Sequence, residues 1–441
     1  MSIDRLVRVR VIPQPSHLHG NNLATQRDGI SMYPALERLH LLFIGGIMRG
    51  FYVVFGTLLV CGIAGAQLVN PIGKGIFLSQ PWSMDHSTAA RTGKSQFTGP
   101  STGAVVWQRA VGGRVYGIAA DQFGRAFLGV TFYEAIWSNE LYSVCYDITG
   151  EISWRVKVAP YVWGFSQGVR SFPTLRPTGE TVVNSGLGQL LRFDSSGNVL
   201  QIITGMSNAT NDNSPALLPD FSIVHFQVAQ LRKHAPDGSI VWSAGAFSQS
   251  DPAVAYNGDV ALGGVRSTEP HGSLDVSYYN ANGTLRWSKS STYGTNTQVC
   301  FGPDGTLYTT VGGTTAYNSD GSIKWSAATG GFGTSLDGLG RVLVPSGNRV
   351  TALNKDSGTQ IWTTVLPFSG SIVGGLTIDR SDRIYVTSTS GYAACLNSDG
   401  TLAWSTKVCD EFTCQPSISS GATIYAAGKV GYSDFYLFRI R

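Results

Sequence analysis

Five polar residues have the types and positions of a ligand-binding rim. They are Arg170, Asn213, Asp251, Asn296 and Gln415, and each stands in a loop that enters a predicted innermost strand of a repeating unit. A few converging polar groups at the mouth of a scaffold are typical of ligand pockets. The alternative is a solvated rim without a ligand. We predict no catalytic residue, because neither a Gly-x-Ser-x-Gly elbow nor a phosphate-binding loop occurs in the context that its chemistry needs.

The histidines and the Asp-Gly pairs predict no metal site. Beyond residue 66 the histidines are His86, His225, His234 and His271, and no two have the spacing of metal ligands. Pairs such as Asp320-Gly321 lack the alternating acids and terminal Glu of a calcium loop. We interpret them as hairpin turns, for which Asp-Gly is a strong signal.

Two cysteines predict a disulfide. Cys409 and Cys414 stand close together in one predicted loop, a spacing that suits a small loop-closing bond in an oxidising compartment. Such a bond would contribute about 2 kcal/mol. Cys145 and Cys395 each precede a turn glycine by five residues, where another repeat has Ala316, so we interpret them as small buried apolar residues.

These residues are distributed over a repeat in which a glycine precedes a tryptophan by four positions. The pairs are Gly103/Trp107, Gly150/Trp154, Gly238/Trp242, Gly283/Trp287, Gly321/Trp325, Gly358/Trp362 and Gly400/Trp404, and an eighth, Gly197/Gln201, has lost its Trp. The glycines are 37 to 47 residues apart. A period of that length indicates a solenoid, a propeller or an array.

One repeat predicts four short antiparallel strands. Residues 341–344 and 349–353 are β-branched runs, residues 354–358 form a turn, and residues 359–362 form a strand that ends at the Trp. An inner strand precedes them, often entered through a proline, as at Asp251-Pro252 and Gln415-Pro416. No segment has a helical period of helical length, so the fold class is all-β.

Four-stranded units bury both faces when they are arranged radially, as in a β-propeller. We expect each Trp to be largely buried against the next blade, as a structural contact. Seven repeats are complete, and the chain after Trp404 has three strands but no Gly-x-x-x-Trp of its own. The prediction is therefore an eight-bladed propeller whose last blade is closed by an N-terminal strand, with residues 104–107 pairing with residues 435–440.

Composition excludes some partners. Residues 1–66 contain six Arg and three acids, which leaves 26 basic and 25 acidic residues in the rest of the chain. A near-neutral propeller has no electrostatic footprint for nucleic acid or for an anionic membrane.

The N-terminal region predicts export. Residues 48–66 resemble a signal peptide, with Arg49, an apolar run and Ala64-Gly65-Ala66 as the cleavage site. Residues 1–47 have no fold pattern, so we interpret them as an upstream extension before the true start at Met48, or as disordered. Residues 67–97 form a leader and residues 98–441 the propeller. We predict a periplasmic or extracellular protein without an integral membrane domain. The alternatives are an uncleaved anchor over residues 39–66 and a lipid attached at Cys61.

The repeat resembles that of the PQQ-like propeller family. Residues 351–362, Thr-Ala-Leu-Asn-Lys-Asp-Ser-Gly-Thr-Gln-Ile-Trp, and residues 145–154 carry this resemblance. The segment from Trp82 to Ser95, with Gly99-Pro100, is similar to the leader of secreted bacterial members, so the resemblance covers residues 81–441. The family includes quinoprotein dehydrogenases, which hold PQQ and Ca²⁺ in the funnel, and a non-catalytic outer-membrane barrel-assembly lipoprotein.

We expect a secreted, non-catalytic propeller that binds another protein or a cell-envelope polymer. The chain has no adjacent cysteine pair and no long insertion that carries an acid cluster, features that the resemblance associates with the dehydrogenases. The alternative is a PQQ- or metal-dependent oxidoreductase. We expect no cofactor, no catalytic activity and a monomeric chain.

Overall fold

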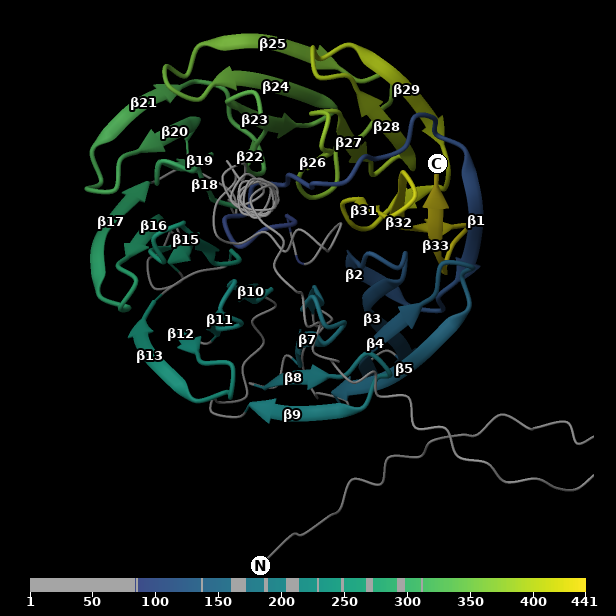
Figure 1. The fold of residues 1–441 in the computed structure, drawn as a ribbon. Coiled ribbons are helices and arrows are strands. Elements are labelled where there is room, and N and C mark those ends of the chain that lie inside the picture. Colours follow the sequence, from purple (N-terminus) through teal and green to yellow (C-terminus); the bar gives the residue numbers. More distant parts are fainter. Residues whose placement is uncertain are drawn as a thin grey trace, which may run out of the picture. The chain divides into compact units, whose positions relative to one another are not determined.

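The computed structural model describes residues 84, 86–135, 138–159, 172–185, 189–203, 214–227, 230–246, 250–266, 273–291, 298–310 and 312–441. Regular elements in these residues are all β-strands, which confirms the predicted all-β class. They form eight antiparallel sheets arranged in a ring (Figure 1). The described part of the chain contains no helix that could cross a membrane. The predicted signal at residues 48–66 lies outside the described residues.

Seven blades each consist of four consecutive strands, ordered from the channel outward. Blades 1 to 4 are β2 (Arg114–Ala120), β3 (Ala126–Ala135), β4 (Ser138–Tyr146), β5 (Ile152–Ala159); β6 (Thr174–Leu175), β7 (Thr181–Asn184), β8 (Leu190–Phe193), β9 (Val199–Ile203); β10 (Ala216–Leu217), β11 (Ile223–Gln227), β12 (Gln230–His234), β13 (Ile240–Gly245); and β14 (Ala253–Val254), β15 (Val260–Arg266), β16 (Ser273–Tyr279), β17 (Leu285–Ser291). Blades 5 to 7 are β18 (Cys300–Phe301), β19 (Leu307–Thr309), β20 (Thr314–Tyr317), β21 (Ile323–Ala327); β22 (Ser335–Leu336), β23 (Arg341–Ser346), β24 (Arg349–Asn354), β25 (Gln360–Val365); and β26 (Thr377–Ile378), β27 (Ile384–Thr387), β28 (Tyr392–Leu396), β29 (Leu402–Lys407).

Blade 8 joins the two ends of the described chain, as the sequence predicted. Its strands are β30 (Glu411–Phe412), β31 (Ser417–Ser419), β32 (Thr423–Val430), β33 (Asp434–Ile440) and β1 (Val105–Ala110). β1 pairs with β33, with Val105 opposite Ile440 and Trp107 opposite Arg439. Both β30 and β31 pair with β32, so the innermost position of this blade is divided between two short strands. The pairing of β1 covers the outer side of β33, which would otherwise be an unpaired edge.

The glycine of each Gly-x-x-x-Trp unit is explained by two constraints. In the hairpin turns it adopts a positive φ, such as +83° at Gly321 and +87° at Gly400, which other residues rarely adopt. A side chain there would also collide with the Trp of the preceding blade: a Cβ on Gly321 would lie 2.9 Å from Trp287. At Gly103 only the second constraint applies, because a Cβ would lie 2.8 Å from Trp404.

We call each such contact between a Trp and the glycine turn of the next blade a Trp pin. Most pins include a hydrogen bond from the indole N–H to a backbone carbonyl of that turn. The bonds are Trp107 to Ile148 (3.1 Å), Trp154 to Ser195 (3.1 Å), Trp242 to Ala281 (3.0 Å), Trp287 to Ser319 (3.0 Å) and Trp325 to Lys355 (2.7 Å). The predicted structural role of the Trp set agrees with this geometry.

Two details of the Trp prediction need correction. The outer strands continue past the Trp instead of ending at it, since β25 runs to Val365 and β29 to Lys407. Only Trp154 and Trp325 are buried, and the other five are half-buried. The reason is that the outermost strand faces solvent on one side, so a ring on it is covered only by the turn of the next blade.

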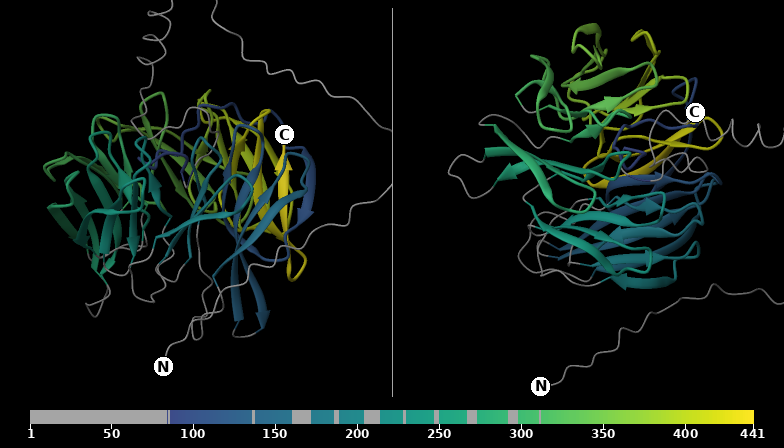
Figure 2. Two further views of the ribbon diagram at one scale, coloured as in Figure 1. Left: turned by 60° about the horizontal axis from the view of Figure 1, so that its bottom comes forward. Right: turned by 60° about the vertical axis from the view of Figure 1, so that its left-hand side comes forward.

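The core lies between neighbouring blades. Its largest cluster combines the inner strands of blades 8 and 1, where Ile118 on β2 packs with Tyr425 on β32 and Phe438 on β33. The prolines of the predicted strand entries precede β6, β10, β14 and β31 by one residue each. The β3–β4 hairpin is longer than the others and projects from the ring (Figure 2).

Candidate binding surfaces

The five rim residues predicted from the sequence do not form a described site. Arg170, Asn213 and Asn296 lie outside the described residues. The carboxylate of Asp251 accepts a hydrogen bond from the backbone N–H of Ser214 at 2.5 Å. The side-chain oxygen of Gln415 is buried and accepts one from the N–H of Gly375 at 2.9 Å. Both residues therefore connect a blade entry to the preceding blade.

The described part of the leader, residues 84 and 86–97, lies against the channel side of four consecutive blades, which the sequence did not predict. In Figure 1 it is the purple and dark blue segment inside the ring. One N–H from each of β14, β18, β22 and β26 donates to a leader carbonyl. These bonds are Val254 to Ala89 (2.7 Å), Phe301 to Ala90 (3.0 Å), Leu336 to Thr92 (2.9 Å) and Ile378 to Gly93 (2.8 Å). The N–H of Ser95 donates in return to the carbonyl of Ile378 at 2.8 Å.

Arg91 anchors the leader between blades 3 and 4. Its side chain is 2% exposed, although arginine is rarely buried. The guanidinium donates through Nε to the carbonyl of Pro252 at 3.1 Å and through Nη2 to the carbonyl of Ser214 at 2.8 Å. These two carbonyls stand at the entries of β14 and β10. Asp251, which holds the N–H of Ser214, thus positions one of the groups that bind Arg91.

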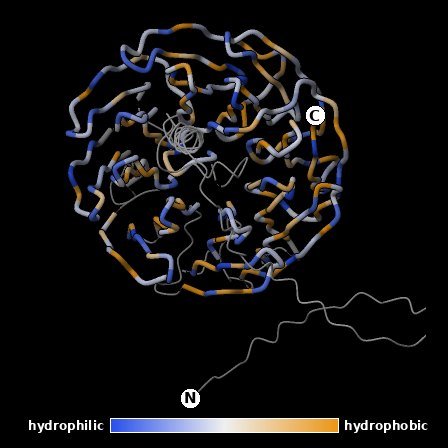
Figure 3. Tube along the Cα trace, in the orientation of Figure 1, coloured by the Kyte–Doolittle hydropathy of each residue, from blue (hydrophilic) through white to orange (hydrophobic). Residues whose placement is uncertain are grey.

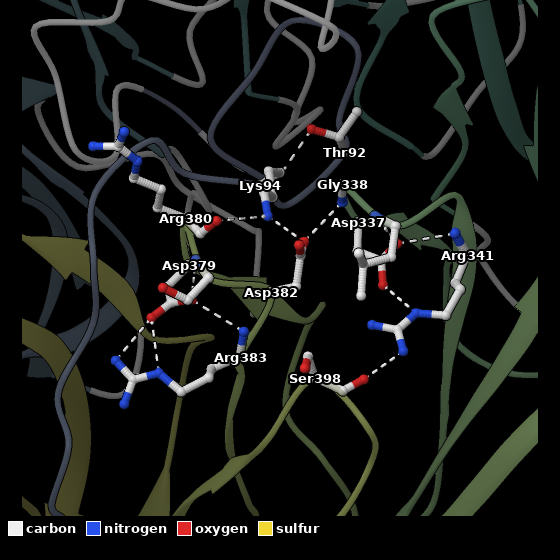
Figure 4. Close-up of polar contacts among 12 residues, drawn as sticks. Thr92, Lys94, Asp337, Gly338, Arg341, Asp379, Arg380, Asp382, Arg383 and Ser398 are labelled. Carbon is white, nitrogen blue, oxygen red and sulfur yellow. Dashed lines mark hydrogen bonds and ion pairs between the residues drawn. The ribbon is translucent and has the colours of Figure 1, made fainter.

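Lys94 anchors the leader between blades 6 and 7 (Figure 4). It is 4% exposed, and its ammonium group pairs with the carboxylate of Asp382 and donates to the carbonyl of Arg380 at 3.4 Å. The same Asp382 oxygen accepts the N–H of Gly338 at 2.7 Å. Asp382 has a φ of +61°, so the turn that presents its carboxylate is conformationally unusual.

Two further ion pairs lie near Lys94 in Figure 4. Asp337 receives Arg341 Nε at 2.6 Å, and burial raises the pKa of this carboxyl while Arg341 lowers it. Asp379 receives Arg383 Nη2 at 2.9 Å and also the N–H of Gly99 at 3.1 Å. The aspartates around the leader are thus each matched with a basic group of this chain.

A pocket of about 200 Å³ opens beside the leader. It is lined mainly by apolar groups, among them Ala90, Tyr256, Phe301 and Leu336, with Asp337 as its acid. Its charged residues already have partners within the chain, since Asp337 pairs with Arg341 and the lining Lys355 pairs with Asp356.

The outer surface of blades 2 and 3 carries an exposed aliphatic band. Its residues are 45–54% exposed and comprise Val199, Leu200 and Ile202 on β9 with Ile240 and Val241 on β13. The band is visible as orange segments on the outermost strands of these two blades in Figure 3. β9 is the edge strand of its sheet and reads Val-Leu-Gln-Ile-Ile, with no charge. Edge strands of soluble proteins normally carry a charge that prevents unwanted pairing.

At the centre of this band, Gln201 replaces the Trp but keeps the contact. Its amide donates to the carbonyl of Asp237 at 2.5 Å, as an indole does in other blades. Its oxygen accepts Arg192 Nη1 at 2.7 Å, and Arg192 also donates to the carbonyl of Pro236 at 3.0 Å. A Cβ on Gly238 would lie 2.4 Å from the Gln201 amide nitrogen, so this glycine is constrained like the others.

The predicted disulfide between Cys409 and Cys414 is not formed. Both are buried free thiols, and burial raises the pKa of each to about 12. Between them β30 is extended and pairs with β32. That pairing holds the loop against β32, and each cysteine packs in the core cluster there as a small apolar residue. Cys145 and Cys395 are buried free thiols, as expected for small core residues.

Two histidines at which the sequence predicted no metal site, His225 and His234, form a buried pair in blade 3. The rings of His225 and His234 stack with centroids 5.1 Å apart. Burial, together with smaller effects of the neighbouring His234 and Arg232, lowers the pKa of His225 to about 3. His234 Nδ1 lies 3.0 Å from the carbonyl of Gly238, the glycine beneath Gln201. Within the described residues no three His, Cys, Asp or Glu side chains are grouped as metal ligands would be.

Comparison with known proteins places the repeat among PQQ-like propellers. A family model described as outer membrane protein assembly factor BamB matches residues 272–366 and 346–435. The outer membrane protein assembly factor BamB of Salmonella typhimurium is 35% identical over 114 residues, which cover 22% of this chain and 29% of that protein. The matched stretch therefore spans less than a third of the length of this curated relative.

Solved structures show the same fold at low identity. A europium-containing methanol dehydrogenase has a TM-score of 0.58 and 12% identity, covering 81% of this chain and 90% of its own. The quinohemoprotein alcohol dehydrogenase from Comamonas testosteroni has a TM-score of 0.60 and 11% identity, with coverages of 86% and 83%. BamB from Moraxella catarrhalis has a TM-score of 0.50 and 12% identity, with coverages of 77% and 100%. At such identities the likeness concerns the fold alone, and together with the repeat and the matched family model it makes this chain a β-propeller of PQQ-like repeats.

Proposed function

We propose that this chain is an exported, non-catalytic propeller that binds another protein or a cell-envelope polymer through the aliphatic band of blades 2 and 3. The carrying observation is the band itself, five aliphatic side chains each 45–54% exposed on two adjacent outer strands. Contiguous exposed apolar surface on a soluble domain is typical of a protein contact site. The matched relatives are outer-membrane assembly factors, which supports a protein partner in the cell envelope.

The surroundings of the leader support a binding role over an oxidoreductase. A quinone with calcium would need carboxylates free to bind the metal in the funnel. Asp337, Asp379 and Asp382 are each engaged by Arg341, Arg383 or Lys94. The residues around the leader therefore do not fit such a group, and we derive no reaction step through it.

The decisive experiment substitutes charges into the band. Leu200→Lys with Ile202→Lys should abolish specific photo-crosslinked adducts formed in the native envelope by a probe placed on β13. The matched control is Ile361→Lys with Val365→Lys on β25 of blade 6, where the two side chains are 50% and 56% exposed. Identical adducts from wild type, band variant and control would refute the proposed surface.

A second measurement tests the alternative function. Purified chain incubated with PQQ and Ca²⁺ is expected to show no dye-linked alcohol oxidation. Stoichiometric quinone absorbance with turnover would replace the binding role by the oxidoreductase.

A further inference from the structure

We infer that the channel-side edges of blades 3 to 7 form a binding track for a polypeptide segment whose backbone carries turns, and that the described part of the leader occupies this track in cis. The track recognises an arginine followed three residues later by a lysine. It is separate from the aliphatic band of blades 2 and 3, so its test is independent of the proposed function.

The backbone part of the track accepts a chain that bends, because His86, Ser87 and Arg91 of the leader adopt positive φ values. Four innermost strands, β14, β18, β22 and β26, each direct one N–H toward a leader carbonyl at 2.7–3.0 Å. These bonds involve only backbone atoms of the leader, so they impose a backbone path and no side-chain identity. Main-chain bonds of this kind supply affinity when a peptide docks along strand edges, while side-chain pockets supply specificity.

The first specificity pocket fits a guanidinium. Two carbonyls, those of Ser214 and Pro252, converge on Arg91 from different blades at 2.8 and 3.1 Å. Carbonyls at fixed positions match the several N–H donors of the planar guanidinium, whereas a lysine would present a single ammonium point. The pocket is built by the ring, because Asp251 fixes the Ser214 peptide independently of the leader.

The second pocket fits an ammonium group. Asp382 is positioned by the N–H of Gly338 from blade 6, while the carbonyl of Arg380 in blade 7 completes the site around Lys94 (Figure 4). Lys94 is 4% and Asp382 13% exposed, so their attraction is screened by little water. Only a basic side chain satisfies this carboxylate.

Shape selects the residues between and beyond the two anchors. Gly93 adopts a φ of +72°, and a Cβ there would lie 2.4 Å from the carbonyl oxygen of Leu376. On the ring, a Cβ at Gly375 would lie 1.9 Å from His86 Nε2. The track is therefore closely complementary to this segment.

The leader is also separable from the blades that hold it. It belongs to no blade, and it is joined to β1 through Ser101 and Thr102, which are exposed. Cutting there leaves β1 paired with β33 and leaves the leader held only by non-covalent contacts.

The test begins with a specific protease site inserted between Ser101 and Thr102 of the full chain. After cleavage, native mass spectrometry should find the leader fragment retained at one per ring. A labelled synthetic peptide of residues 84–98 should then exchange into the track, as followed by fluorescence anisotropy. Immediate loss of the fragment with no peptide binding, or loss of cooperative unfolding on cleavage, would overturn the inference.

Peptide variants test specificity without altering the ring. Arg91→Gln and Lys94→Gln should each raise the Kd at least tenfold, since each removes charge-assisted hydrogen bonds. Thr98→Ala is the matched control, because Thr98 is exposed and its loss should leave the Kd unchanged.

A double-mutant cycle assigns the lysine pocket. Asp382→Asn in the ring should weaken the wild-type peptide but not the Lys94→Gln peptide. Equal effects on both peptides, or equal binding of a scrambled peptide, would contradict the assignment.

Discussion

The outer contacts between blades recur from repeat to repeat, whereas the inner contacts are made by one segment that occurs once in the chain. On the outside, each repeat carries its own Trp pin, and each pin joins one pair of blades. On the inside, a single leader segment contacts blades 3 to 7, through one carbonyl for each of blades 4 to 7 and through two buried basic side chains, of which Arg91 also reaches blade 3. The outer contacts are modular, so the loss of one leaves the others intact, whereas loss of one leader anchor affects several blades.

The outer contacts also vary within their common plan. Gln201 reproduces both the packing and the hydrogen bond of a Trp pin with a smaller side chain. At Trp362 and Trp404 the indole N–H has no acceptor among the described residues. The carbonyl of Ser398, which occupies the acceptor's place beside Trp362, is instead bound by Arg341. Packing on the glycine is therefore the constant part of the pin, and the hydrogen bond is optional.

Removing a fully formed pin should have the largest effect. Trp325→Ala should lower the free energy of unfolding by about 3–5 kcal/mol, because it removes a buried ring and its bond to Lys355. Urea unfolding monitored by circular dichroism measures this loss. A loss below about 1 kcal/mol would mean that the pins contribute little to docking.

Removing one leader anchor should have the next largest effect. Lys94→Met leaves the Asp382 carboxylate, 13% exposed, without its cation, and should cost about 1–3 kcal/mol. Lys289→Met, on the exposed side of β17, is the control and should be neutral. Hydrogen exchange should show weaker protection in β22 and β26 together. Weakening confined to a single blade would contradict the view that the leader couples blades.

Acid should loosen the contact between blades 2 and 3. Folded His225 stays neutral down to about pH 3, whereas unfolded histidine protonates near pH 6.5, so the unfolded chain binds more protons between these values. The unfolding free energy should therefore fall as pH decreases from 6.5 toward 3. His225→Asn should flatten this part of the profile, and an unchanged slope would remove His225 as its cause.

Restoring the missing ring should have the smallest effect. Gln201→Trp adds aromatic packing on Gly238 but removes the acceptor of Arg192, so we expect a gain of up to about 1 kcal/mol. Blade 2 should be the least protected blade in hydrogen exchange of the natural chain and should become similar to its neighbours in the variant. If blade 2 is already the best protected, Gln201 is not a weak pin.

The sequence was sufficient for the fold because its signals recur. Gly-x-x-x-Trp marks recur in every blade except blade 2, and turn dipeptides and strand-entry prolines recur in several blades, so the blade number and the pairing of residues 105–107 with 439–440 could be predicted. The sequence analysis placed each Trp at the end of its strand because the repeated motif ends at the Trp. In the structure the backbone pairing continues beyond that residue.

The sites were harder to predict because their contacts occur once. Nothing in the run from Ala89 to Lys94 has a period, and its partners Pro252 and Asp382 are distant in the chain. The sequence also did not show that Asp251 and Gln415 accept hydrogen bonds from backbone N–H groups. An amide or carboxylate in a loop can bind a ligand or a backbone N–H equally well. The predicted disulfide failed because spacing alone does not report that both cysteines pack into the core as separate buried thiols.

The closure of blade 8 has a consequence for the order in which the chain can fold. β1 emerges early in synthesis, but its partner β33 is completed about 330 residues later. At translation rates of about 5–20 residues per second, β1 waits on the order of tens of seconds for that partner. The seven blades between them can each form from consecutive strands as they appear, but the ring cannot. During that interval the early segment is an unpaired β-strand. A chaperone that covers it would prevent its pairing with other chains until β33 is complete.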